Sequence, residues 1–101
     1  MDDQQKVAQF IEQHELHASP EYRLLDLISE LGEVAKDAAE STGYGTSPDE
    51  LAVNTDEVGD TLFALLAFAE SVDVDASEAL SEALEKYETR LSESGSASSG
   101  V

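Results

Sequence analysis

Two pairs of carboxylates are the residues of this chain whose type and spacing could do chemistry. Glu30 and Glu33 form the first pair, and Glu57 and Asp60 form the second. Residues three positions apart on a helix are neighbours on one face, with Cβ atoms about 5–6 Å apart. Carboxylate oxygens are the ligands that hard divalent cations such as Mg²⁺ prefer. The two pairs therefore predict a cation site built from two helices.

The second pair leads directly into a run without charge. Residues 61–69 place apolar side chains on every side of a helix. A helix of that kind is buried, and carboxylates at its N-terminal end need a counter-charge. Four converging carboxylates would also raise one another's pKa values. Mg²⁺ would offset both effects, and it characteristically completes its coordination with water and substrate phosphates.

A solvated acidic face is the alternative for the first pair. Asp26, Glu30, Glu33 and Asp37 form a stripe opposite the Leu/Ile face of their helix, and charged outer faces are ordinary in amphipathic helices. The second pair favours a site instead. The loop between the two helices is short enough to favour antiparallel packing, which would bring the two pairs close together.

Three basic residues lie where they could meet phosphate oxygens beyond a metal. Lys36 follows Glu33 by one turn, and Lys86 and Arg90 are one turn apart on the last predicted helix. The alternative is an ordinary salt bridge between each cation and an acid one turn away. We predict Lys36, Lys86 and Arg90 as substrate-binding residues.

Two further motifs are weak. His14 and His17 are three positions apart, not the four of the zinc-protease helix, and neither follows an acid at the Glu-x-x-His spacing of di-iron bundles. The segment Gly43–Gly45 lacks the Gly-Lys-Ser/Thr ending of a phosphate loop. We expect surface histidines and a linker.

The spacing of apolar residues predicts four helices that would position these groups. Ser19, followed by a proline, begins the second helix, and Ser47 and Asp75 begin capping-box sequences. An interruption near residues 54–55 would put Glu57 in the first turn of a new segment. The expected helices cover about residues 3–16, 19–41, 47–72 and 75–91.

The fold class that follows is all-α. A third helix buried on two faces cannot be covered fully by a chain this short. We therefore expect a four-helix bundle completed by homo-oligomerisation, as a homodimer or homotetramer. Residues 1–91 should form a single domain, and residues 92–101, rich in Ser and Gly, a flexible tail.

Composition excludes several classes of partner. Twenty-three Asp and Glu against five Lys and Arg give a net charge of −18, which repels nucleic-acid phosphates and anionic lipid. The chain has no cysteine, and its apolar stretches fall far short of the roughly 20 residues of a membrane span. We expect a cytoplasmic protein without nucleic-acid or membrane partners. The acidity suggests the saline cytoplasm of an extreme halophile, where salt screens exposed charges.

Three segments together resemble the MazG-like nucleoside triphosphate pyrophosphohydrolases. They are SELGEVAK at residues 29–36, DEVGDTLFALL at 56–66 and ALEKYETR at 83–90. The resemblance implies an all-α oligomer that hydrolyses nucleoside triphosphates between the α- and β-phosphates, giving monophosphate and pyrophosphate. It also implies Mg²⁺, which Mn²⁺ could replace, held by acids equivalent to Glu30, Glu33, Glu57 and Asp60. Glu30 or Glu33 could also orient the attacking water as the general base.

The chain departs from the family pattern at two positions. The family often begins its first motif with two acids, and Ser29 takes the first of these places. Its last motif usually has Asn after the Lys, and Tyr87 stands there. Two alternatives therefore stay open beside an enzyme: a catalytically weakened nucleotide- or partner-binding module, and a structural helical oligomer.

Overall fold

The computed structural model describes residues 2–94, and their regular structure is entirely helical. The first helix, α1, spans Asp2–Gln13 and buries Gln4, Val7 and Ile11, which recur at helical spacing. The chain then leaves the helix through Glu15, whose φ of 52° lies in the left-handed region. The predicted first helix ran three residues further, to Leu16; instead Leu16 donates its backbone N–H to the Ile11 carbonyl at 2.9 Å, beyond the helix end.

The second helix, α2, spans Pro20–Ser41 and matches its predicted range. Ser19 caps it, with its side-chain oxygen accepting from the Tyr22 N–H, and Pro20 occupies the first turn where no intrahelical N–H is lost. Gly43, with a φ of 58°, follows the C-terminus. A Cβ at Gly43 would lie 2.6 Å from the Thr46 hydroxyl oxygen, so both the backbone conformation and the available space favour glycine.

The segment after this turn differs from the prediction. Ser47 makes no side-chain capping bond, and only a 3₁₀ turn, η1 at Pro48–Glu50, forms there. The third helix, α3, begins afresh after Asn54 and spans Thr55–Ser71. A helix over residues 47–54 was therefore wrong, whereas the expected interruption that places Glu57 in a first turn is confirmed.

The last helix, α4, spans Ala76–Ser94. Its capping residue behaves as expected, because Asp75 Oδ1 accepts from the backbone N–H groups of Ser77 and Glu78 at 2.8 and 3.1 Å. The Glu78 N–H bond is the main reason that the pKa of Asp75 is lowered. The helix continues three residues past Leu91 into the predicted tail, and residues 95–101 lie outside the described part of the chain.

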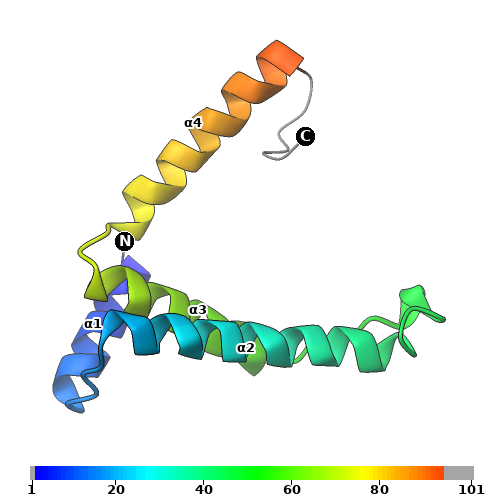
Figure 1. The fold of residues 1–101 in the computed structure, drawn as a ribbon, viewed down its shortest axis with the longest axis horizontal. Coiled ribbons are helices and arrows are strands. Elements are labelled where there is room, and N and C mark those ends of the chain that lie inside the picture. The colour runs from blue at the N-terminus through cyan, green and yellow to red at the C-terminus, as the bar shows by residue number, and fades with distance from the viewer. Residues whose placement is uncertain (1, 95–101) are drawn as a thin grey trace.

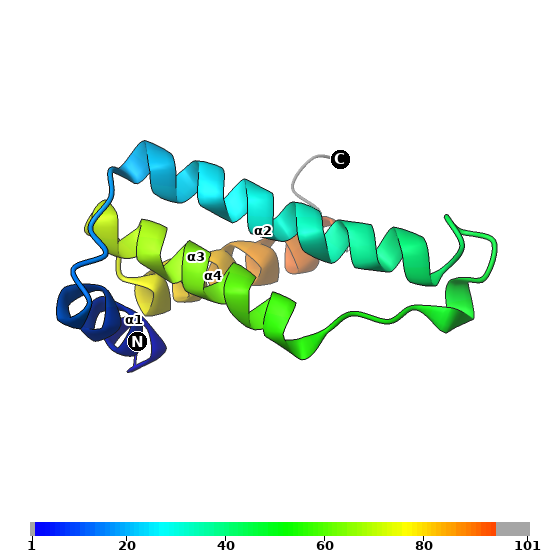
Figure 2. The ribbon, with the colours of Figure 1, turned by 90° about the horizontal axis from the view of Figure 1, so that it is seen from below.

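Helices α2 and α3 form an antiparallel hairpin, and α1 packs across one end of α3 (Figure 2). The small face of α3 makes these contacts: Ala64 and Ala67 are each 1% exposed. The core cluster consists of Val7, Ile11, Leu66 and Ala67. Within one chain, α3 therefore packs through Ala64 and Ala67 together with Leu66, which is 2% exposed.

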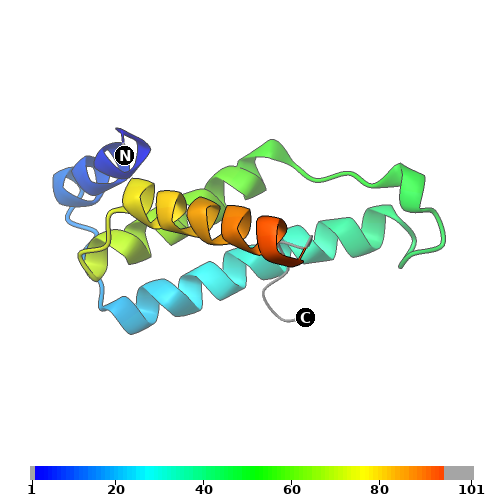
Figure 3. The ribbon, with the colours of Figure 1, turned by 90° about the horizontal axis from the view of Figure 1, so that it is seen from above.

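The leucine-rich faces, by contrast, stay uncovered. Exposed apolar side chains follow α2, α3 and α4 at alternating spacings of three and four: Leu24, Ile28 and Leu31; Val58, Leu62 and Leu65; Leu80, Leu84, Tyr87 and Leu91. Helix α4 diverges from the α2–α3 hairpin (Figure 1), and the extensive helix pairs are α2 with α3 and α1 with α3. Seen from above, α4 follows the same general direction as the hairpin (Figure 3). One chain alone therefore does not close a four-helix bundle.

Gln4 joins the first helix to the start of the last. Its side chain is 5% exposed, donates to Glu70 Oε1 and the Val74 carbonyl, and accepts from the Ala76 N–H at 2.8 Å. The hydrogen bonds of Gln4 therefore tie the start of α4 to α1.

No helix within residues 2–94 is both long and apolar enough to cross a membrane.

Replacing Gln4 by leucine should destabilise the fold by about 1–3 kcal/mol, because the Val74 carbonyl and the Ala76 N–H would be left without their partner. Chemical denaturation measures the loss. Gln5→Leu is the matched control, since Gln5 is the exposed neighbour on the same helix. Equal effects at the two positions would show that the buried hydrogen bonds of Gln4 contribute nothing.

Candidate functional site

The α2–α3 hairpin places acids of both predicted pairs along one interface. Glu30 is half-buried on α2, and burial is the largest cause of its raised pKa. The negative charge of Asp60, across on α3, is the next cause, followed by Asp26 and Glu33 on its own helix. Antiparallel packing thus brings Glu30 and Asp60 within electrostatic reach of each other.

A second acidic contact lies further along the hairpin, between Glu57 of α3 and Asp37 of α2. A hydrogen bond with Asp37 raises the pKa of Glu57 to about 7, helped by burial and by the charges of Asp37, Asp56 and Glu33. Glu57 Oε2 and Asp37 Oδ2 are both shielded from solvent, and no donor within residues 2–94 reaches either atom. Two carboxylates can bond each other only when they share a proton. Glu57 therefore holds the shared proton up to about pH 7, and above that pH the two carboxylates need a cation as counter-charge.

The acids are not held together as a finished metal site. Within residues 2–94, no three side chains of Asp, Glu, His or Cys gather closely enough to enclose an ion. Glu33 and Asp60 are exposed at the edge of the interface, whereas Glu30, Asp37 and Glu57 are half-buried in it. Carboxylates without a counter-charge repel one another. This repulsion explains why the acids of α2 and α3 do not converge on one point.

The chemistry of this acidic interface fits a hard divalent cation. The acids named above offer carboxylate oxygens alone, which are the donor set of Mg²⁺ and Ca²⁺ rather than of zinc or copper. The two donor-less oxygens of Asp37 and Glu57 are the atoms that such an ion would satisfy. Asp37 was identified in the acidic stripe by sequence but not as a ligand; its position seven residues after Glu30, on the same helical face, was the available signal.

The shared-proton contact predicts a specific pH dependence without metal. The folded state holds a proton on Glu57 up to about pH 7, whereas the unfolded chain releases it near 4.5. The resulting stabilisation is full below the lower value and is lost as pH rises through the higher one. Thermal unfolding in EDTA should therefore show wild type and Glu57→Gln converging at low pH, with the variant increasingly more stable up to pH 7 and the difference constant above it.

A difference that does not vary with pH would contradict the shared proton. The comparison must be made at constant molar KCl, because the other acids also titrate. Using the difference between wild type and variant removes their common contribution.

Two of the predicted cations, Lys36 and Lys86, form no ion pair with the acids of residues 2–94. Lys36 is exposed on α2, and Lys86 is exposed on the divergent α4, with its Nζ 5.3 Å from the centre of the Tyr87 ring. Neither lysine forms an ion pair with any of residues 2–94; the pairs found there are Lys6–Asp3 and His17–Glu12. Arg90 is half-buried on α4. The structure places Lys86 and Arg90 on a helix that diverges from the hairpin.

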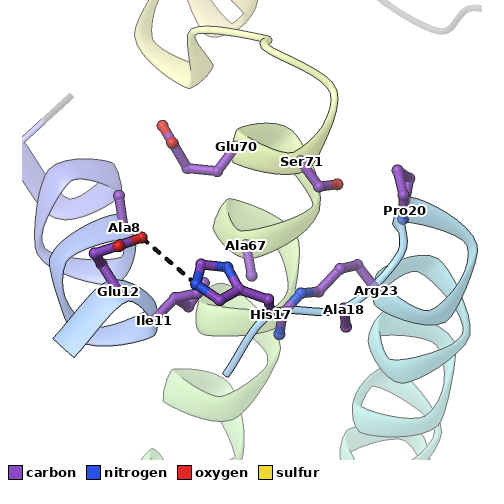
Figure 4. Close-up of a pocket in the computed structure, with 10 residues that line it drawn as sticks. All are labelled: Ala8, Ile11, Glu12, His17, Ala18, Pro20, Arg23, Ala67, Glu70 and Ser71. Atoms are coloured by element: carbon purple, nitrogen blue, oxygen red, sulfur yellow. Dashed lines mark ion pairs between the residues drawn. The ribbon is translucent and has the colours of Figure 1, made fainter. Parts of the chain in front are cut away.

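A pocket lies elsewhere, where α1, α3 and the start of α2 meet (Figure 4). It has a volume of about 330 Å³, and Arg23 and His17 reach into it toward Ala67 of α3. Arg23 is 7% exposed and donates to the Leu16 carbonyl. His17 Nε2 lies 3.5 Å from Glu12 Oε2 of α1, so this imidazole pairs with an acid beside the connection from α1 to α2.

Comparison with protein families gives one match. The MazG nucleotide pyrophosphohydrolase domain matches residues 18–93, which include α2, α3 and nearly all of α4. No curated protein and no solved structure matches the chain. The family match covers three quarters of the chain and contains every acid of the α2–α3 interface, and the chain therefore belongs to the MazG nucleotide pyrophosphohydrolase domain family.

Proposed function

We propose that this chain hydrolyses nucleoside triphosphates between the α- and β-phosphates, releasing a monophosphate and pyrophosphate. Family membership supports pyrophosphohydrolase chemistry on nucleotides in general. The observation that carries the specific proposal is the pair of solvent-shielded, donor-less oxygens of Asp37 and Glu57 in an interface of acids. A cation that binds phosphates is the partner that such an interface lacks.

Five acids would hold the cation in this proposal: Glu30, Glu33, Glu57 and Asp60, joined by Asp37. When bound, Mg²⁺ would neutralise charge on phosphate oxygens and ease the deprotonation of water. Mn²⁺, with the same preference for oxygen, could replace it. The half-buried positions of Glu30, Asp37 and Glu57 keep bulk water from screening these charges.

Of Glu30 and Glu33, Glu30 is the better candidate for the residue that accepts a proton from water. Its pKa is raised by burial, by Asp60 and by its helix neighbours, and a base works best when its pKa approaches the working pH. Glu30 would take a proton from the attacking water, whose oxygen bonds to phosphorus as the bridging α–β P–O bond breaks. Glu33, exposed and one turn away, would orient the same water.

The cations would serve the phosphate chain. Lys36 lies on α2 near the acidic interface, and Lys86 and Arg90 follow one face of α4. These positive side chains would offset the negative charge of the phosphate groups, including the charge that develops on the pyrophosphate as it is released. We further propose that the protein works as a homodimer or homotetramer, because one chain leaves its leucine faces uncovered. Its proposed location is the cytoplasm.

Pyrophosphate release from a panel of ribo- and deoxyribonucleoside triphosphates tests the proposal. The assay needs molar KCl and compares Mg²⁺, Mn²⁺ and EDTA. Turnover that requires Mg²⁺ or Mn²⁺ supports it. Nucleotide binding without turnover favours a binding module weakened at Ser29 and Tyr87, and neither binding nor turnover favours a structural oligomer.

A further inference from the structure

Arg23 is a buried cation without an acid beside it. Its side chain lies in the first turns of α2 and is 7% exposed. It forms no ion pair within residues 2–94, where the pairs are Lys6–Asp3 and His17–Glu12. Buried charges in proteins are normally paired, and the N-terminal end of a helix favours a negative charge over a positive one. The position of Arg23 therefore calls for an anion that the described chain does not supply.

The guanidinium of Arg23 also keeps most of its hydrogen-bonding capacity. Arginine carries five N–H donors, and within residues 2–94 this side chain makes one hydrogen bond, from Nη2 to the Leu16 carbonyl. Nε and Nη1 make none there, yet neither is sealed from solvent as the oxygens of Asp37 and Glu57 are. The unused donors are therefore open to a ligand.

Arg23 lines the pocket of about 330 Å³ between α1, α3 and the start of α2 (Figure 4). This volume lies at the small end of ligand pockets, which span about 300–1,000 Å³. Part of the wall is apolar, with Ile11 and Ala67 from the core cluster and Pro20 from α2. A buried guanidinium beside apolar surface suits a small organic carboxylate better than an inorganic ion, which has no apolar part to bury.

An acid lines the same pocket without pairing with Arg23. Glu70 extends from α3 on another side of the pocket (Figure 4), and it forms no ion pair within residues 2–94. Its Oε1 accepts from Gln4 at 3.1 Å, and its Oε2 has no hydrogen bond there. The other acid of the pocket, Glu12, already pairs with His17. Glu70 would repel a simple anion and Arg23 a simple cation, so the lining favours a ligand that carries both charges.

The pocket is separate from the acidic interface and lies partly outside the family match. None of the acids Glu30, Glu33, Asp37, Glu57 and Asp60 lines it. The match begins at residue 18, whereas α1, which ends at residue 13, contributes one wall of the pocket. The first helix therefore adds a cavity to the matched domain.

We propose that this pocket binds a free amino acid, whose carboxylate lies on the Arg23 guanidinium and whose ammonium group lies on Glu70. The planar fork of a guanidinium matches the two oxygens of a carboxylate, and the apolar part of the ligand packs on Ile11 and Ala67. Both α-amino acids and ω-amino acids supply these two charges, at different spacings. The proposal goes beyond the proposed function and does not depend on it.

Calorimetric titration of the full chain in molar KCl tests the proposal without any assay of turnover. Valine is the α-amino acid probe and 4-aminobutyrate the ω-amino acid probe, while acetate and methylammonium each carry one of the two charges. Valine or 4-aminobutyrate should bind saturably, about tenfold or more tightly than acetate or methylammonium, because each of these forms one charge-assisted contact fewer. The tighter of the two amino acids identifies the spacing. No saturable binding of either amino acid, or equal binding of acetate or methylammonium, overturns the proposal.

Two variants assign the two ends of the ligand. Glu70→Gln keeps an oxygen that accepts from Gln4 and should bind the amino acid no more tightly than acetate. Arg23→Lys keeps the positive charge and a donor for the Leu16 carbonyl but lacks the fork, so its affinity for the amino acid should fall about tenfold. Glu82→Gln removes an exposed charge from α4 and should bind as wild type does.

Circular dichroism checks that each variant is folded, and Glu70→Gln alone decides if Arg23→Lys is not. Wild-type affinity for the amino acid in a folded Glu70→Gln or Arg23→Lys protein overturns the proposal. An equal loss of affinity in Glu82→Gln also overturns it, because net charge would then explain the effect.

Discussion

Glu57→Gln should abolish pyrophosphate release while leaving a protein that is at least as stable as wild type in the absence of metal. Glu57 is hydrogen-bonded to Asp37 and has a solvent-shielded oxygen that no donor of residues 2–94 reaches. An amide of the same shape donates a hydrogen bond to Asp37 and removes one of two repelling charges. The same change removes an anionic ligand from the proposed metal site. Stability and activity should therefore move in opposite directions.

We expect a loss of about 100-fold or more, the size seen when an active site loses one preorganised electrostatic partner. Millimolar Mg²⁺ should raise the unfolding temperature of wild type, because a ligand that binds only the folded state stabilises it. The variant should show little of this shift. Circular dichroism confirms that helicity is retained.

Glu15→Gln is the matched control for the charge change. Glu15 is exposed in the connection between α1 and α2, away from the hairpin acids. This control should keep both its activity and its response to Mg²⁺. If Glu15→Gln is also inactive, the loss of activity comes from the change in net charge and not from the position of Glu57. If Glu57→Gln keeps full turnover, Glu57 is not a ligand of the metal.

The helix termini were predictable because their causes are local. Ser19 and Asp75 bond N–H groups within three residues, so their capping role depends on little beyond the neighbouring sequence. Ser47 has the same sequence signature but makes no such bond. A short apolar segment after it, residues 51–53, gives a helix there little to bury, and the regular structure resumes only after Asn54.

The burial pattern was less predictable, because it depends on which faces meet. Sequence periodicity identified the leucine faces, yet on α3 the residues buried within one chain are Leu66 and three alanines, whereas Leu62 and Leu65 remain exposed. Gln4 is buried because three groups from α3, α4 and the connection between them surround it, a coincidence of tertiary positions that no local pattern encodes.

The candidate site shows the same division between local and tertiary information. The face of α2 that carries Glu30, Glu33 and Asp37 follows from helical spacing alone. Which of these acids contacts Glu57 depends on how far α2 slides along α3, and Asp37 occupies that position. The place of Lys86 depends on the direction of α4, which Gln4 sets at its start.

Removing salt should unfold this protein almost completely. The chain has a net charge of −18 and a core cluster of four buried residues. At 1 M salt the Debye length is about 3 Å, but at 0.1 M it is about 10 Å, so in dilute buffer many acids interact at once. Unscreened self-repulsion opposes every compact state, and dispersal of an oligomer would expose the leucine faces as well. Loss of the helical circular dichroism signal on dialysis out of molar KCl, with EDTA throughout, is the expected result.

A less acidic variant separates charge screening from other effects of salt. Glu21→Gln, Asp49→Asn and Glu50→Gln together remove three exposed charges that lie outside the hairpin acids. If repulsion is the cause, this variant should stay folded to a lower KCl concentration than wild type. Equal ionic strengths of chloride and sulfate should then protect equally, whereas stronger protection by sulfate would indicate that salt acts by favouring apolar burial. If wild type instead keeps its full helicity in dilute buffer, its four helices tolerate the repulsion between acids despite the small core. That result would also contradict the hypothesis of a saline cytoplasm.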